Sequence, residues 1–178
     1  MDSVYSSMNI DQKVGQLYSV WTASRYGQAE INEIKNIIDK YHIGGLIFSL
    51  GSINDQIISH NIFQKQSNIP LLISMDAEWG LGMRLEDGFS FPYNITLGAI
   101  RDDSLIFNVG QRIGEHLKKI GVHLNFAPVS DVNTNPKNPI IGARSFGENK
   151  FNVSKKSIKY IQGLNESGDL AVGKHFPG

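Results

Sequence analysis

Several side chains that can do chemistry follow directly after short apolar runs of the chain. Carboxylates accept hydrogen bonds from hydroxyl groups, while ammonium and imidazole groups donate them, so such a set suits the recognition of a polar molecule. Short, nearly continuous apolar runs are typical of strands that are buried on both faces. The side chains in question are Asp76 after the run 71–75, Asp131 after the run 122–129, and Lys174 and His175 after the run 170–172.

Apolar residues at helical spacing separate these runs. Asn9 followed by Gln12 has the pattern of a helix N-terminus. The clearest helix is expected to begin at Asp102 and Asp103, because acidic residues favour the start of a helix. The apolar stripes of the predicted helices are Val14, Leu17, Tyr18 and Trp21; Ile31, Ile34, Ile37, Ile38 and Tyr41; Ile57, Ile58 and Ile62, capped by Asn54; Leu105, Ile106, Val109, Ile113 and Leu117; and Ile158, Ile161 and Leu164.

The predicted strands alternate with these helices. The run 46–48 is expected to be the first strand, and Gly44 and Gly45 before it are expected to end the preceding helix. Because parallel neighbours need a covering helix between them, this alternation predicts an α/β fold with a parallel sheet. The further strands, which bring the number to about four, are the runs 71–76, 122–129 and 170–172, with a polar loop over about 133–150.

Two architectures fit this alternation, namely an open doubly wound sheet and part of a (β/α)₈ barrel. An open sheet usually carries a glycine-rich phosphate loop after a strand, but Gly44-Gly45 precedes its strand instead. In a barrel the carboxyl ends of the strands converge on one pocket, where the four side chains named first would meet. About four strands in 178 residues fall short of the ~250 residues of a whole barrel. We therefore expect the N-terminal half of a (β/α)₈ barrel.

The composition argues against several classes of function. The 17 Lys and Arg balance the 17 Asp and Glu, so no overall charge favours nucleic acid as a partner. The chain has 0 cysteines, which excludes disulfides and thiolate metal sites. His116 and His123 are too far apart in sequence for a histidine metal pair, and we expect neither a metal nor another cofactor.

The pattern of apolar residues also bears on membranes and export. No stretch approaches the roughly 20 apolar residues that a membrane span needs, so we expect none. The segment 1–9 lacks the pattern of a signal peptide. The compartment stays open between cytoplasm and periplasm, because a signal peptide could have preceded this segment.

A series of short motifs says more together than any one of them. In chain order they are Lys13-Val14-Gly15-Gln16-Leu17, Met75-Asp76 through Arg84-Leu85, Phe91-Pro92 with Thr96-Leu97-Gly98, Ala127-Pro128-Val129-Ser130-Asp131-Val132, Ile141-Gly142-Ala143-Arg144-Ser145-Phe146-Gly147 and Lys174-His175-Phe176-Pro177-Gly178. Together they resemble the family 3 glycoside hydrolases, and most of all the bacterial β-N-acetylglucosaminidases (β-N-acetylhexosaminidases).

The resemblance implies a barrel enzyme that removes terminal β-linked N-acetylglucosamine from a cell-wall or chitin-type saccharide. The family retains configuration through a covalent glycosyl intermediate, which needs a nucleophile and an acid/base. In the members that this chain resembles, a histidine just past the last motif is the acid/base and a later aspartate is the nucleophile. We therefore expect residues 1–178 to be the first part of one barrel domain, inactive alone because no catalytic residue of the pair lies in it.

The resemblance also assigns roles to single residues. Carboxylates and guanidinium groups that match the family's motifs would grip the hydroxyl and carbonyl oxygens of the sugar. Glu78 and Asp131 are expected only to orient neighbours such as Arg144 or Lys174. The residues expected to bind substrate are Asp76, Arg84, Arg144, Lys174 and His175.

The chain departs from the family in the segment 77–83, between the aspartate and the arginine. Trp79 stands where the usual motif has a glycine, and it either forms a wall of the pocket or simply packs. Two alternatives therefore remain open. One is a β-glucosidase or another exo-glycosidase of the same family, and the other is a non-catalytic sugar-binding protein.

Overall fold

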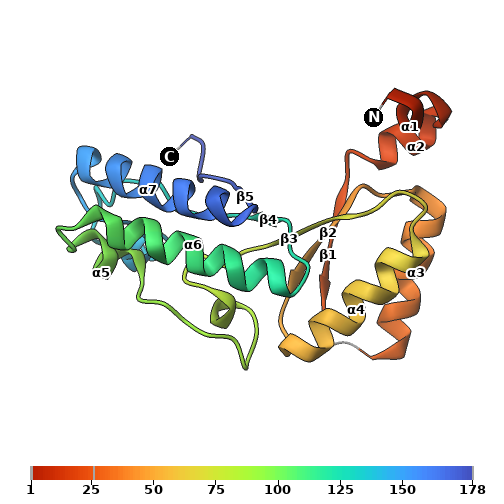
Figure 1. Ribbon diagram of the computed structural model, residues 1–178, viewed down its shortest axis with the longest axis horizontal. Helices are drawn as coiled ribbons and strands as arrows, with labels where there is room; N and C mark the ends of the chain where they lie inside the picture. The colour runs from red at the N-terminus through yellow and green to blue at the C-terminus, as the bar shows by residue number, and fades with distance from the viewer. Residues whose placement is uncertain (1, 26, 178) are drawn as a thin grey trace.

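The chain folds around one parallel sheet. The computed structural model describes residues 2–25 and 27–177. The sheet has five strands in the order β1-β2-β3-β4-β5, so each strand pairs with its neighbour in sequence (Figure 1). All four pairings are parallel, which confirms the α/β class expected for a partial (β/α)₈ barrel. The strands are β1 (Ser19–Ala23), β2 (Gly45–Ser49), β3 (Leu72–Met75), β4 (Leu124–Asn125) and β5 (Leu170–Ala171).

Helices connect the strands as parallel pairing requires. In Figure 1, α3 and α4 lie beside β1 and β2, while α6 and α7 run side by side at the other end of the sheet. The helices are α1 (Asp2–Ser7), α2 (Ile10–Gly15), α3 (Gln28–Tyr41), α4 (Ile53–Gln66), α5 (Asn94–Gly98), α6 (Asp103–Lys119) and α7 (Lys150–Ser167), with the 3₁₀ turns η1 (Leu81–Met83) and η2 (Gly142–Arg144).

The two faces of the sheet differ in burial. Leu46, Phe48, Ile73 and Met75 are each 0% exposed, and the Phe48 ring lies 6.2 Å from the Phe63 ring of α4, so these side chains form the core under the helices. On the opposite face, strand register places Trp21 beside Ile47 and Ile47 beside Ser74. Trp21 and Leu170 remain 49% and 57% exposed on the uncovered parts of the sheet. The sheet is thus packed on one side and open on the other.

Helix α6 forms as its sequence predicts. The Asp102 side chain caps it by accepting a hydrogen bond from the Ser104 backbone N–H, and Lys118 and Lys119 stand in its last turn. Both features complement the helix dipole. Ile106, Ile113 and Leu117 are fully buried, together with Gly110 and Gly114 of the same helix, against the neighbouring core.

The N-terminal region differs from the expectation of one amphipathic helix. Asn9 and Gln12 do form a capping box, but α2 ends at Gly15. Leu17 and Tyr18 are 83% and 62% exposed, and Trp21 lies in strand β1. The expected buried stripe was therefore wrong, and the run 46–48 belongs to the second strand of five instead of the first of about four.

Three other boundaries also need correction. Helix α3 ends at His42, which takes the left-handed conformation with φ 51°, before the glycines are reached. Ser52 caps α4 instead of Asn54, and Ile57 and Ile58 are exposed. The expected strand 122–129 is regular only at β4, although a bridge between Val129 and Lys174 resumes the pairing further along. Gly178, the last residue of the final motif, lies outside the described residues.

Candidate functional site

An open cleft of about 700 Å³ lies where the strands end. It is lined by side chains from β1 and β2 and by side chains that follow β3, β4 and β5, and barrel proteins place their sites at the carboxyl ends of their strands. Its apolar walls are Trp21, Ile47, Trp79, Met83 and Phe126, and its charged groups are Asp76, Glu78, Arg84, Arg144, Lys174 and His175.

Asp76 directly follows β3 and is held by two cations. Its Oδ1 lies 2.7 Å from Nζ of Lys174, and its Oδ2 accepts a hydrogen bond of 2.7 Å from Nη2 of Arg84. The Asp76 side chain is nevertheless 28% exposed. The carboxylate is therefore fixed in direction and still reaches the cleft.

Glu78 lies two residues further on and is the deepest charge of the cleft. Arg144 grips it in a bidentate pair, with Nε 2.9 Å from Oε2 and Nη2 2.7 Å from Oε1. Lys174 Nζ also lies 2.7 Å from Oε1. The Glu78 side chain is 1% exposed. Lys174 thus bridges the two carboxylates, and Glu78 contacts both Arg144 and Lys174.

The cations keep both carboxyl groups ionised. Burial alone would raise the pKa of Asp76, but the hydrogen bonds and charges of Lys174 and Arg84 outweigh it and hold that pKa below its ordinary value. Burial likewise opposes ionisation of Glu78, and Arg144 and Lys174 lower its pKa in the same way. The Glu78 carboxylate in turn raises the pKa of Arg144. At neutral pH the cleft therefore holds fixed, alternating charges.

Arg144 reaches Glu78 from a long loop. It is the last residue of η2, and the Asn94 side chain of α5 holds it by donating to the Arg144 carbonyl oxygen at 2.8 Å. Its Nη1 also donates to the carbonyl oxygen of Ile140 at 3.1 Å. Two elements thus fix the arginine that sequence reasoning placed in a functional loop.

His175 stands at the rim of the cleft. Its ring Nδ1 lies 2.7 Å from Oδ2 of Asp131, whose same oxygen also accepts from the His175 backbone N–H at 3.1 Å. We expected Asp131 to orient Arg144 or Lys174; its side chain bonds to His175, and its charge also helps to raise the pKa of Arg144. The ring is therefore oriented by a carboxylate, while its side chain remains 44% exposed.

Sequence reasoning missed three residues of this region. Trp21 was assigned to a helix, yet it lines the cleft from β1. Asn125 and Tyr160 are 0% exposed and bond to the backbone of residues 77 and 78. The available signal was the polar Asn125 inside a predicted strand that is apolar apart from Asn125 and His123, because a buried amide must find partners.

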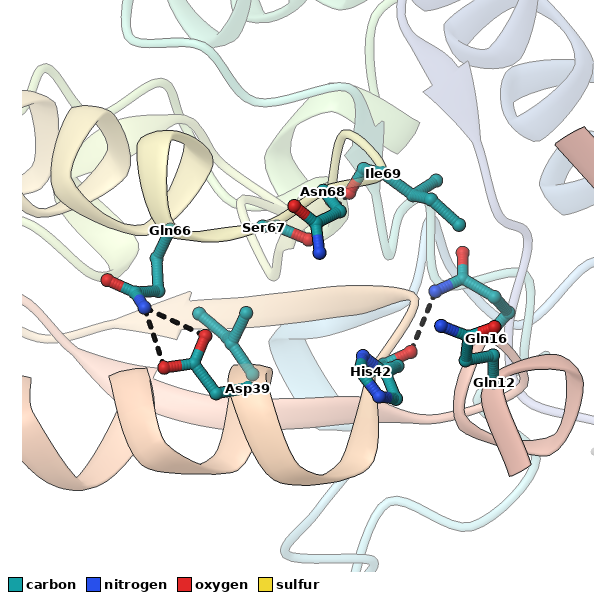
Figure 2. A pocket seen from close by; sticks show the side chains of 9 residues that line it. Gln12, Gln16, Asp39, His42, Gln66, Ser67, Asn68 and Ile69 are labelled. Atoms are coloured by element: carbon teal, nitrogen blue, oxygen red, sulfur yellow. Dashed lines mark hydrogen bonds between the residues drawn. The ribbon is translucent and has the colours of Figure 1, made fainter. Parts of the chain in front are cut away.

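A second, smaller pocket lies at the opposite end of the sheet. Its volume is about 70 Å³, and it is formed where α2, α3 and α4 approach one another before β2 and β3 begin. Figure 2 shows that Gln66 points to Asp39, both of whose oxygens lie 2.7 Å from Gln66 Nε2, and that Gln16 donates to the His42 carbonyl. These hydrogen bonds join α4 to α3 and the end of α2 to the end of α3, so the polar groups serve the fold. The charged cleft is the better functional candidate.

The described residues also bear on metal ions and membranes. Within residues 2–25 and 27–177, no group of three or more His, Asp or Glu side chains is arranged to hold a metal ion. Over the same described part of the chain, no helix has both the length and the apolar character needed to cross a bilayer.

The parallel sheet and the cleft at its strand ends are those of a barrel-type α/β domain, and comparison with known families agrees. Residues 9–178 match the model of the glycosyl hydrolase family 3 N terminal domain. The match covers nearly the whole chain, so the chain belongs to glycosyl hydrolase family 3.

Individual relatives point the same way. The chain is 36% identical over 159 residues to beta-hexosaminidase A of Pseudoalteromonas piscicida, which covers 82% of this chain and 27% of the relative. Among solved structures, a glycoside hydrolase family 3 beta-N-acetylglucosaminidase from Paenibacillus sp. str. FPU-7 matches with TM-score 0.84 and 33% identity, over 97% of this chain and 34% of that one.

A structure of the beta-glucoside phosphorylase BglX bound to 2FGlc matches with TM-score 0.90 and 25% identity, over 99% of this chain and 32% of that one. The chain therefore spans about a third of the length of these three proteins.

Proposed function

We propose that this chain forms the first part of an exo-acting β-N-acetylglucosaminidase and supplies much of its sugar-binding site. The names of the hexosaminidase relatives support the substrate class. The observation that carries the proposal is the cleft at the strand ends, in which Asp76 is gripped by Lys174 and Arg84 and remains partly exposed.

Alternating charges of this kind suit a pyranose. Each sugar hydroxyl both donates and accepts hydrogen bonds, so it needs acceptors and donors side by side. Asp76 supplies the acceptor, and Arg84, Arg144 and Lys174 supply fixed donors. Hydrogen bonds to charged groups are stronger than neutral ones, so this arrangement would set the orientation of the ring.

His175 would contact the sugar from the rim. Because Nδ1 is engaged by Asp131, Nε2 is the ring nitrogen that can face a substrate. The imidazole is then held in one orientation, as a binding group requires. We assign it to binding and not to proton transfer.

The two innermost carboxyl groups are poorly suited to general acid catalysis. A general acid must carry its proton near neutral pH, whereas the pKa values of Asp76 and Glu78 are lowered. Retention through a covalent intermediate needs both an acid/base and a nucleophile, and by the family resemblance both are expected from residues that follow this chain. We expect the 178-residue chain to bind sugar without hydrolysing it.

The test compares two substrates with the protein expressed from its complete reading frame. We expect an aryl β-N-acetylglucosaminide to be cleaved with a higher kcat/KM than the aryl β-glucoside, and the first product seen by NMR to be the β anomer. A preference for the glucoside would reject the N-acetylglucosamine assignment, and an initial α anomer would reject retention.

The second candidate is an enzyme of the same family that acts on β-glucosides. It is favoured by the likeness to the beta-glucoside phosphorylase and by Trp79, which changes one wall of the cleft. The same pair of substrates distinguishes it. Sugar binding by the complete protein with no turnover of either substrate would instead favour the non-catalytic binding protein.

A further inference from the structure

Two buried side chains hold the short backbone segment that carries Asp76 and Glu78. The amide of Asn125 on β4 bonds to Ala77 in both directions, since the Ala77 N–H donates to Oδ1 at 2.9 Å and Nδ2 donates to the Ala77 carbonyl at 3.2 Å. The hydroxyl of Tyr160 on α7 donates to the Glu78 carbonyl at 2.9 Å. Asn125, Ala77 and Tyr160 are each 0% exposed.

The Asn125 amide extends the sheet beyond its last regular pair. Met75 and Asn125 are partners in the register of β3 and β4, and Ala77 comes two residues after Met75. A side-chain amide offers the same donor and acceptor as a peptide group, so it can replace the missing rung of the ladder. Asn125 therefore fixes the backbone direction at Ala77, the residue between the two carboxylates.

That direction matters because one lysine must reach both carboxylates. Lys174 Nζ lies 2.7 Å from Asp76 Oδ1 and 2.7 Å from Glu78 Oε1. A rotation of the peptide at Ala77 would move the two side chains apart and break the bridge. It would also displace Arg144, whose guanidinium follows Glu78.

We propose that Asn125 and Tyr160 are positioning residues for substrate binding. They act through the backbone of residues 77 and 78, and they set where Asp76, Glu78 and the cations paired with them face the cleft. The effect on sugar affinity rests on the proposed function, whereas the effect on the ion pairs does not.

The chain contains a matched control for Asn125. At the other end of β3, the Gln64 amide makes the same two bonds to Leu71, with Nε2 donating to the Leu71 carbonyl at 2.9 Å and Oε1 accepting from the Leu71 N–H at 3.0 Å. Gln64 does not line the cleft. A purely structural role would make the two amides equivalent.

The experiment compares Asn125→Ala, Asn125→Asp, Tyr160→Phe and Gln64→Ala in the complete protein. Asn125→Asp keeps the acceptor for the Ala77 N–H and loses the donor to the Ala77 carbonyl, while Tyr160→Phe keeps the aromatic ring and loses the hydroxyl. These two milder variants test the inference if Asn125→Ala does not fold. Calorimetry measures the Kd for N-acetylglucosamine, and the ¹⁵N–¹H resonance of Arg144 Nε reports its pair with Glu78. Thermal melting is recorded for every variant.

We expect the Asn125 variants to weaken sugar binding by about tenfold or more, since small displacements of positioning groups are costly. Tyr160→Phe should weaken it less, and both changes should shift the Arg144 Nε resonance. Gln64→Ala should lower the melting temperature while leaving the Kd and that resonance as in the wild type.

Two results would overturn the inference. One is a set of folded Asn125 and Tyr160 variants that melt lower but bind sugar as tightly as the wild type does. The other is an Arg144 Nε resonance that stays in place in these variants or moves equally in Gln64→Ala. If the wild-type protein binds no N-acetylglucosamine, the proposed function fails, and the resonance alone decides whether the two residues position the ion pairs.

Discussion

Glu78 and Arg144, 66 positions apart in sequence, form a two-bond ion pair whose carboxylate is almost completely buried. The pair joins the loop after β3 to the long loop after β4. Because a buried charge is costly without its partner, this contact links the geometry of the cleft to the stability of the fold.

Removal of Arg144 should therefore destabilise the protein. Arg144→Ala leaves Glu78 with Lys174 alone, and the free energy of unfolding should fall by about 3–5 kcal/mol. The double variant Glu78→Gln/Arg144→Met should recover part of that loss, because no buried charge remains unpaired. Urea unfolding measures both.

The exposed pair between Arg112 and Glu115, 2.6 Å apart, is the control. Arg112→Ala should cost no more than about 1 kcal/mol, as surface pairs do. An equal cost for Arg144→Ala and Arg112→Ala would show that Glu78 is solvated and not buried in solution.

Asp76 should matter for affinity more than for stability. Asp76→Asn keeps the shape but removes the charge that accepts hydrogen bonds, so the Kd for the sugar should rise by about ten- to a hundredfold. The melting temperature should change little, because the side chain is partly exposed. Asp39→Asn, in the small pocket of Figure 2, is the matched control and should leave the Kd unchanged. Equal effects of the two substitutions would contradict the binding role of Asp76.

Tryptophan emission should report sugar binding directly. The chain has 2 tryptophans, and both Trp21 and Trp79 line the cleft. A bound sugar excludes water from their rings, so emission should shift on titration with N-acetylglucosamine. Trp79→Phe and Trp21→Phe would separate the two contributions. Unchanged emission at saturating sugar would place the ligand elsewhere.

Asp169 should make stability depend on pH. Burial raises its pKa to about 6, whereas the unfolded chain has the ordinary value near 3.8. The folded protein thus keeps a proton that the unfolded chain releases, and stability should decline as the pH rises from about 4 through about 6. Asp169→Asn removes this titration, so its melting temperature should vary less between pH 4 and pH 8 and exceed that of the wild type at pH 8.

The exposed neighbour Glu166 provides the control for this pH effect. Glu166→Gln should leave the pH profile as it is in the wild type. A wild-type profile that rises between pH 4 and pH 6 and is unaffected by Asp169→Asn would show that another group dominates.

Close packing of α6 on α7 should make Gly110 irreplaceable. A Cβ atom at this position would lie 2.3 Å from the carbonyl oxygen of Tyr160. Alanine is the better helix former by about 1 kcal/mol, but overpacking costs about 1–3 kcal/mol, so Gly110→Ala should lower the free energy of unfolding. Asn108→Ala, on the exposed side of α6, should be neutral or slightly stabilising. A stabilised Gly110→Ala variant would mean that the two helices can separate without loss.

Local patterns in the sequence identify most of the fold. Helix α6 has clear capping residues and an apolar helical period, and strand β3 has a continuous apolar run. Both elements are confirmed. Strand β1 was missed because Val20 and Trp21 are only partly buried there, and the spacing from Val14 to Trp21 happens to fit a helix. A short strand at the edge of a sheet leaves too weak a periodic signal to outweigh such a coincidence.

The site shows the same division between local and distant information. The positions of Asp76 and Lys174 after their strands follow from local patterns, but their contact spans 98 residues and depends on strand order. The contact between Asp131 and His175 was not foreseen for that reason, since sequence separation gives no measure of distance across a sheet. The supporting bonds of Asn125 and Tyr160 likewise become visible only in three dimensions.

The order of the strands has a consequence for how the protein is made. Because each strand pairs with the one synthesised just before it, every newly translated unit finds its neighbour already in place as the chain leaves the ribosome. In the cluster that it forms with Asp76, Glu78 and Arg144, Lys174 is the last residue to be synthesised. Shorter nascent chains therefore contain Asp76 and Glu78 without the lysine that both contact. This shared ion pair can form only after the fifth strand has been synthesised.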